Sequence, residues 1–168
     1  IRNERGEYSP AHRSFLEFFV ALKLVAELGC LLPDFTALAQ QQSHVNTEKA
    51  AKCYKWSEYF KRKTDRIGQV VTIEPLQAFE AESPSHVIET LGHSTLSKAV
   101  LDLMLLMMDT AESKEKVAKR LTNILLAADA GDINATEDTL GYFRGNLITL
   151  ILRVSASALQ GSNLSYRT

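Results

Sequence analysis

The sequence predicts an all-α protein, an irregular bundle of about five to seven helices with a short extended N-terminal segment and a poorly ordered, repeat-like tail. Three observations support this fold class. Apolar residues recur at spacings of three and four along most of the chain. Serine, threonine, asparagine or aspartate precedes several of these runs, as N-caps do. Residues 69–73 have strand character, but Pro75 and Pro84 leave too little around them for a sheet.

Length and charge limit the classes of function. The 168 residues suffice for one domain, and a hydrophobic fraction of 45% is enough for a core. The 19 basic and 20 acidic residues give a net charge of −1, which argues against binding to nucleic acid or to an acidic membrane through phosphate neutralisation. We therefore expect neither nucleic acid nor a membrane among the partners.

Cysteine usage and the N-terminus indicate a cytoplasmic origin. Cys30 and Cys53 lie near apolar helical positions without a CxxC motif, which favours reduced, buried thiols over a disulfide. The first residues are charged and include no initiator methionine, and the apolar run at residues 103–108 is far shorter than the ~20 residues of a membrane helix. We expect a cytoplasmic chain excised from a longer soluble protein.

The first helix is predicted to follow Ser14 and to end at Gly29, a residue suited to a left-handed stop. Ser14 followed by Glu17 before an apolar run is a capping box, in which each side chain bonds a first-turn N–H. Pro10 closes a short extended piece ahead of the helix. His12 therefore lies at a helix N-terminus, where backbone donors and the helix dipole favour an anion.

Two more helices and a connector are predicted before residue 86. Pro33 interrupts the apolar pattern and Asp34 caps the second helix. The third begins at Asn46 or Thr47 and includes Tyr54. We interpret its next three aromatic residues as helical core rather than as a base-stacking or peptide-binding platform: Trp56, Tyr59 and Phe60. The connector, residues 64–86, packs three apolar residues onto the helices: Ile73, Leu76 and Phe79.

Three helices are predicted in the C-terminal half. Thr95 or Ser97 opens the most apolar one, over residues 96–109, which we expect to be buried nearly all round. The next ends at residues 130–132 and buries one face: Val117, Leu121, Ile124, Leu125 and Ala128. A turn at residues 141–146 then leads into a last helix over residues 147–154.

Metal sites and catalytic pairs are not predicted. His86, Glu89 and His93 would share one face of a continuous helix, but Gly92 interrupts it and no further ligand is near in sequence. Ser14 beside His12 is better explained as a cap than as a nucleophile with its base. We expect no enzyme activity in this chain.

The tail carries a short periodic pattern. Residues 157–161 and 162–166 align with a period of five, and each has a small residue two positions before a central leucine. This pattern is typical of pentapeptide repeats, whose coils bury their leucines only against neighbouring coils. Two units cannot complete a coil, so we expect poor order.

Residues 8–22, YSPAHRSFLEFFVAL, resemble the end of the winged-helix part of NACHT-type STAND signal-transduction NTPases of bacteria. In that family a short strand, a histidine, a small hydroxyl residue and an F-x-E-[YF]-[FY]-x-A helix follow in this order. The resemblance implies three regions, namely the end of the winged-helix module (1–30), a helical bundle linker (31–154) and the start of a repeat array (155–168). The family's histidine contacts the β-phosphate of bound nucleotide, and His12 is the matching residue.

The resemblance implies a non-catalytic regulatory linker that couples the nucleotide state of an ATPase to a C-terminal sensor array. ATP or ADP would be the parent's cofactor, whereas this chain lacks a phosphate loop and is expected to hold no cofactor itself. The implied partners are the parent's own nucleotide-binding domain and repeat array, with homo-oligomer formation on activation.

The alternative is a stand-alone helical protein–protein interaction module with no nucleotide link. It predicts an exposed apolar patch or groove, near Trp56 or on the methionine-rich helix. DNA binding is disfavoured, because residues 14–29 offer only Lys23 as an outward base-reading or phosphate-binding side chain.

Overall fold

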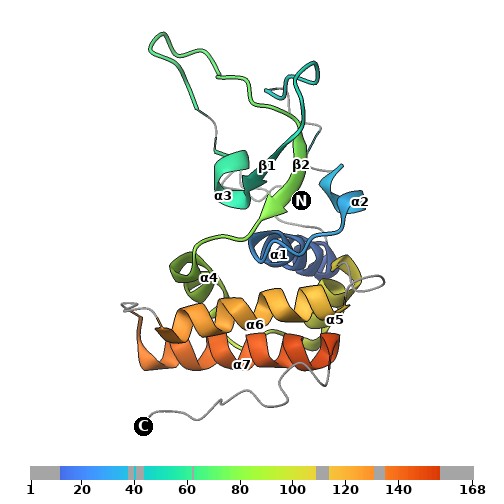
Figure 1. The fold of residues 1–168 in the computed structure, drawn as a ribbon, viewed down its shortest axis with the longest axis vertical. Coiled ribbons are helices and arrows are strands. Elements are labelled where there is room, and N and C mark those ends of the chain that lie inside the picture. Colours follow the sequence, from blue (N-terminus) through green and yellow to red (C-terminus); the bar gives the residue numbers. More distant parts are fainter. Residues whose placement is uncertain are drawn as a thin grey trace. The chain divides into compact units, whose positions relative to one another are not determined.

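The computed structural model describes residues 12–37, 40, 44–61, 63–108, 114–130 and 135–155. Within these ranges the chain forms seven helices and two short strands (Figure 1). The chain divides into two compact units, unit 1 (residues 1–83 and 96–108) and unit 2 (residues 84–95 and 109–168). Helices dominate, as predicted, but the strands pair, so the fold is not strictly all-α. The predicted extended segment and repeat-like tail lie outside the described residues.

In unit 1, helix α1 (Arg13–Glu27) ends at the predicted glycine. Gly29 has a φ of +65°, and its N–H donates to the carbonyl of Ala26 at 2.9 Å. The N–H of Cys30 donates to the carbonyl of Val25 at 3.1 Å. This pair of bonds is the Schellman motif, which satisfies the last carbonyls of a helix. The prediction of a left-handed stop is confirmed.

Helix α5 (Lys98–Met107) packs along α1. The predicted Ser97 cap is confirmed, because the Ser97 Oγ accepts the N–H of Val100 at 3.3 Å. Burial all round is wrong, since the side chain of Leu106 is 72% exposed. The helix instead buries one face: Val100, Leu101, Met104 and Met107.

The second helix starts two residues earlier than predicted. Helix α2 (Pro33–Thr36) has Pro33 at its first position and Leu32 as N-cap, so Asp34 lies in the first turn instead of capping it. Proline suits this position, because its fixed φ is helical and its missing N–H would have no partner there.

The third predicted helix is wrong over residues 46–55. The Asn46 Oδ1 accepts the N–H of Glu48 at 3.0 Å, a local bond that holds the chain in a turn. Strand β1 (Lys52–Lys55) follows, and only helix α3 (Trp56–Tyr59) is helical.

The predicted absence of a sheet is also wrong. Strand β2 (Leu76–Glu80) lies parallel to β1, with Lys52 opposite Leu76 and an irregularity between Lys52 and Tyr54. Within the connector, Leu76 and Phe79 are buried as predicted, whereas Ile73 is half-buried. The strands form because distant segments supply each other's backbone partners, which a local pattern does not encode.

Unit 2 contains α4 (Pro84–Leu91), α6 (Lys114–Ala130) and α7 (Glu137–Val154). The apolar face predicted for α6 is confirmed, since each of its residues is buried: Val117, Leu121, Ile124, Leu125 and Ala128. Among the described residues, no helix combines the length and the apolarity needed to cross a membrane.

The predicted turn at residues 141–146 is wrong, because α7 runs through it. Thr136 caps this helix, and its Oγ1 accepts the N–H of Thr139 at 3.2 Å. Each internal glycine costs a helix about 1 kcal/mol relative to alanine. Burial of one face outweighs that cost: Phe143, Leu147, Leu150, Ile151 and Val154.

Candidate functional site

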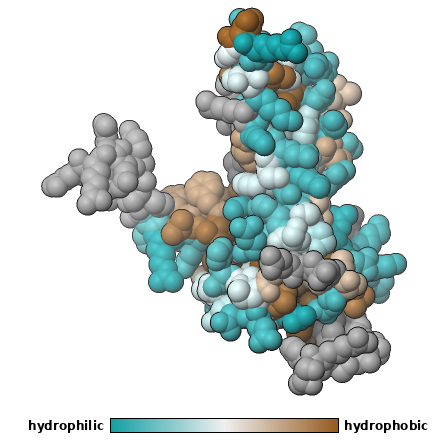
Figure 2. Space-filling view, turned by 90° about the vertical axis from the view of Figure 1, so that its left-hand side faces the viewer, coloured by the Kyte–Doolittle hydropathy of each residue, from teal (hydrophilic) through white to brown (hydrophobic). Residues whose placement is uncertain are grey.

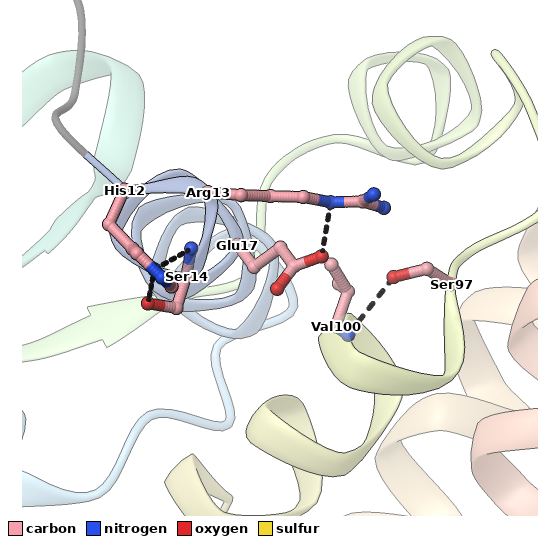
Figure 3. Close-up of polar contacts among 6 residues, drawn as sticks. All are labelled: His12, Arg13, Ser14, Glu17, Ser97 and Val100. Carbon is pink, nitrogen blue, oxygen red and sulfur yellow. Dashed lines mark hydrogen bonds and ion pairs between the residues drawn. The ribbon is translucent and has the colours of Figure 1, made fainter.

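His12 lies at the N-terminus of α1, as the sequence predicts, but it has an unexpected role there (Figure 3). Its backbone is extended, and its Nδ1 accepts the N–H of Ser14 at 3.3 Å and lies 2.6 Å from the Ser14 Oγ. The predicted capping box is therefore wrong. The helix starts at Arg13, the imidazole takes the place of the serine hydroxyl, and the Glu17 carboxylate accepts from the Arg13 Nε at 2.9 Å.

The cap determines which nitrogen of His12 carries the proton. Because Nδ1 accepts the Ser14 N–H, a neutral ring must hold its proton on Nε2. The side chain is exposed, so this tautomer offers an N–H donor beside a helix N-terminus. Both features favour an anion such as a phosphate oxygen. The nucleotide contact itself remains a prediction.

An apolar groove of about 780 Å³ lies in unit 1. We name it the aromatic groove, because seven of its lining side chains are aromatic: Phe15, Phe18, Phe19, Phe35, Trp56, Phe60 and Phe79. Three leucines and Ser14 complete the lining: Leu22, Leu31 and Leu103. Small-molecule and peptide sites have volumes of this order and are mostly apolar.

The groove's aromatic wall forms where α3 meets β2. The Trp56 ring lies 4.4 Å from that of Phe60 and 5.3 Å from that of Phe79. Tyr59 is fully buried beside Phe60 and Phe79, with its ring 5.3 Å from the Phe60 ring and 5.9 Å from the Phe79 ring. The prediction of a helical core therefore holds for Tyr59, whereas Trp56 and Phe60 line a surface groove.

The opposite wall is the first half of α1. Phe15, Leu16 and Phe19 are 59%, 53% and 57% exposed, although they lie on consecutive turns of one helix. Single exposed apolar residues are ordinary, but a contiguous set beside an apolar groove indicates an interaction surface. On the face shown in Figure 2, hydrophobic residues form separate patches on a mainly hydrophilic surface.

The three residues considered for a metal do not share a helix. His86 and Glu89 lie on α4, which ends at Leu91, and His93 follows in the loop. Within the part of the chain that the structure describes, no three histidine, cysteine or acidic side chains gather closely enough to hold a metal ion.

Tyr54, near the end of β1, makes an aromatic contact with Tyr59 and a polar contact with Glu74. The Tyr54 ring lies 5.5 Å from that of Tyr59, and the Tyr54 hydroxyl donates to the Glu74 carboxylate at 2.5 Å. That hydrogen bond lowers the pKa of Glu74 from its ordinary value, and the ammonium of Lys49 at 3.7 Å acts in the same direction. Burial raises the pKa of Tyr54, and its bond to Glu74 adds to this.

This contact predicts a pH-dependent contribution to the stability of unit 1. Because the folded pKa of Glu74 is lowered, its contribution is present above its unfolded pKa of about 4.3 and is lost as pH falls through the folded pKa. The raised pKa of Tyr54 predicts a second loss above about pH 10. The free energy of unfolding, measured with urea and Trp56 fluorescence, should therefore depend less on pH in Tyr54→Phe than in the natural chain. Tyr142→Phe, on α7, is the control, and equal pH slopes in all three proteins would refute the coupling.

The sequence located His12, and the interaction-module alternative predicted an apolar groove near Trp56, but the elements that line this groove were not predicted. The groove is lined by side chains of α1, α2, α3, α5 and β2, and no local pattern brings these together. One signal was available: the run Phe15-Leu16-Glu17-Phe18-Phe19 has more large apolar side chains than one helix face can bury.

Comparisons with known proteins give one informative relative. No family model matches the chain, and no solved structure matches it. An uncharacterized WD repeat-containing protein of Nostoc sp. is 42% identical over 166 residues, which is 99% of this chain and 10% of that protein. The chain thus spans about a tenth of the length of the curated relative it matches. That relative is named for WD repeats rather than pentapeptide repeats.

Proposed function

We propose that the chain is a non-catalytic helical linker region of a longer, repeat-containing signalling protein. The aromatic groove is the observation that carries this proposal. Fully burying a phenylalanine side chain is worth about 1.5–3 kcal/mol, so leaving Phe15 and Phe19 more than half exposed forfeits much of that gain. The length of the Nostoc relative supports an occupant that lies elsewhere in the same parent chain.

We further propose that the longer parent protein is a NACHT-type STAND ATPase, and that its nucleotide-binding domain occupies the aromatic groove. Ser14 both lines the groove and hydrogen-bonds the Nδ1 of His12. A domain in the groove would therefore lie beside the Nε2 donor of His12, where it could present a nucleotide phosphate. The helical linker would then favour one of two packings according to nucleotide state and pass that bias to the repeat array. The three regions 1–30, 31–154 and 155–168 belong to this proposal.

Substitution of His12 in the full-length parent tests the finer proposal. Loss of a hydrogen bond to a charged phosphate is worth about 1.5–3 kcal/mol, so His12→Ala should weaken ADP retention by about 10- to 100-fold and raise basal activation. His12→Asn is the matched control for the helix start, because asparagine is a good N-cap but its side chain is shorter. ADP retention should fall in His12→Asn as well. Unchanged ADP retention and basal activation in His12→Ala would show that the assignment of His12 is wrong.

The aromatic groove also favours a second candidate, the stand-alone interaction module, because that hypothesis predicts an apolar groove near Trp56. In this case a second copy of the chain would fill the groove, placing its own Phe15 and Phe19 there. The solution mass of the chain by sedimentation distinguishes the two candidates. A specific dimer that Phe19→Ser converts to monomer supports the module, whereas a monomer that binds the parent's nucleotide-binding domain supports the linker.

A further inference from the structure

A second groove, of about 460 Å³, lies on unit 2 between α6 and the start of α4. We name it the basic groove, because every charged residue that lines it is a cation: Lys116, Lys119 and Arg120. The remaining lining residues are polar or apolar: Pro84, Asn123, Ile124 and Ala127. This groove plays no part in the proposed function above.

The cations of the basic groove are neighbours on one helix. Lys116 is followed by Lys119 and Arg120 at spacings of three and four, so the three side chains share one helix face. A ligand that carries carboxylates would be attracted to this group of positive charges. Since the whole chain has a net charge of −1, this is local segregation of charge and not a general basic character.

The groove changes character along α6. Beyond Asn123 its lining is apolar, with Ile124 buried in the floor and Ala127 exposed. Leu126, which is 51% exposed, lies three residues beyond Asn123 and therefore close to the same face. From Lys116 to Ala127 the face spans about 16 Å at the rise of an α-helix, or three turns. The complementary ligand is a segment of similar length, with acidic residues at one end and an apolar residue at the other.

We propose that the basic groove binds an acidic, amphipathic peptide segment of a protein partner. Complementary charge would guide the segment into place, and the apolar end would fix its direction. Single-stranded nucleic acid fits less well, because none of the residues that line the groove is aromatic and able to stack a base.

The proposal is tested with a fluorescein-labelled synthetic peptide that places three glutamates at i, i+3 and i+4 and a leucine two turns later. Binding to the complete chain is followed by fluorescence anisotropy. Exposed ion pairs contribute modestly, so Lys116→Gln/Lys119→Gln should lower the affinity for the peptide by about tenfold. Raising the salt concentration from about 50 to 300 mM should lower the affinity several-fold. Glutamine keeps the helix propensity of lysine, so α6 should remain folded.

Lys61→Gln/Lys63→Gln is the matched control, because it removes the same charge from two exposed lysines of unit 1. It should change the affinity less than twofold. Equal weakening in both double variants would mean general electrostatic attraction and would overturn the proposal. No binding up to about 1 mM peptide, equal binding of a peptide with glutamine in place of glutamate, or tighter binding of an oligonucleotide of equal net charge would overturn it as well.

Discussion

Gly29→Ala is expected to lower the free energy of unfolding of unit 1 by about 2–4 kcal/mol. The φ of +65° alone costs an alanine about 1–2 kcal/mol. A Cβ at this position would also lie 2.5 Å from the backbone N of Ala81 and 3.0 Å from the carbonyl carbon of Glu80. These are backbone atoms at the end of β2, which cannot rotate away, so the chain must shift and lose packing.

Gly68→Ala separates the cost of the positive φ from the cost of the steric clash. Gly68 also has a positive φ, +82°, but a Cβ there would meet nothing within 4 Å. It should therefore cost only about 1 kcal/mol. Trp56 is the single tryptophan of the chain and lies in the same unit, so urea unfolding followed by its fluorescence reports both variants. Equal losses would show that the close approach to Ala81 does not constrain the fold.

The tight packing at Gly29 also affects the aromatic groove. Beside Gly29, the N–H of Glu82 donates to the carbonyl of Glu27 at 2.8 Å, which ties the end of α1 to the chain after β2. The Glu82 carboxylate in turn accepts the N–H of Ser57 at 2.8 Å, in the first turn of α3. These contacts connect the three elements that carry Phe19, Trp56 and Phe79, so Gly29 helps to set the spacing of the groove's walls.

The features that the sequence predicted correctly are those encoded within one segment. The Gly29 stop, the Ser97 cap and the buried face of α6 each depend on residues a few positions apart. His12 was found for the same reason, since proline, histidine and an apolar run mark a helix start. The error there concerned chemistry: an imidazole nitrogen can cap a helix, so the serine and glutamate were free to make other contacts.

The features that were missed depend on distant partners. β1 and β2 are each too short to be recognised alone, and their pairing is stabilised by aromatic residues that meet only in the folded unit. The lining of the aromatic groove is missed for the same reason, because five elements contribute to it. The continuity of α7 through Gly141 and Gly145 likewise depends on packing, which outweighs the local preference for a turn.

Asn146→Ala is expected to lower the stability of unit 2 by about 2–4 kcal/mol. The sequence suggests a turn asparagine, but Asn146 is buried on α7, and its Nδ2 donates to the carbonyls of Leu91 and Ser94, both at 2.8 Å. Leu91 is the last residue of α4, so one of these bonds satisfies a carbonyl that the helix itself leaves without an intrahelical donor. Alanine would remove both hydrogen bonds and leave the buried Leu91 carbonyl without this donor.

Hydrogen exchange of the α4 and α7 amides measures this loss locally, with the amides of α1 and α5 in unit 1 as the internal reference. Asn123→Ala, on the exposed face of α6, is the matched control and should change stability by less than about 0.5 kcal/mol. Gly92 limits any relaxation in Asn146→Ala, because α7 passes so close that a Cβ on Gly92 would lie 2.6 Å from the Thr139 carbonyl oxygen. The loop after α4 therefore cannot move toward α7 to recover the lost bonds. If protection of α4 persists in Asn146→Ala, packing rather than these two hydrogen bonds holds the loop after α4 to α7.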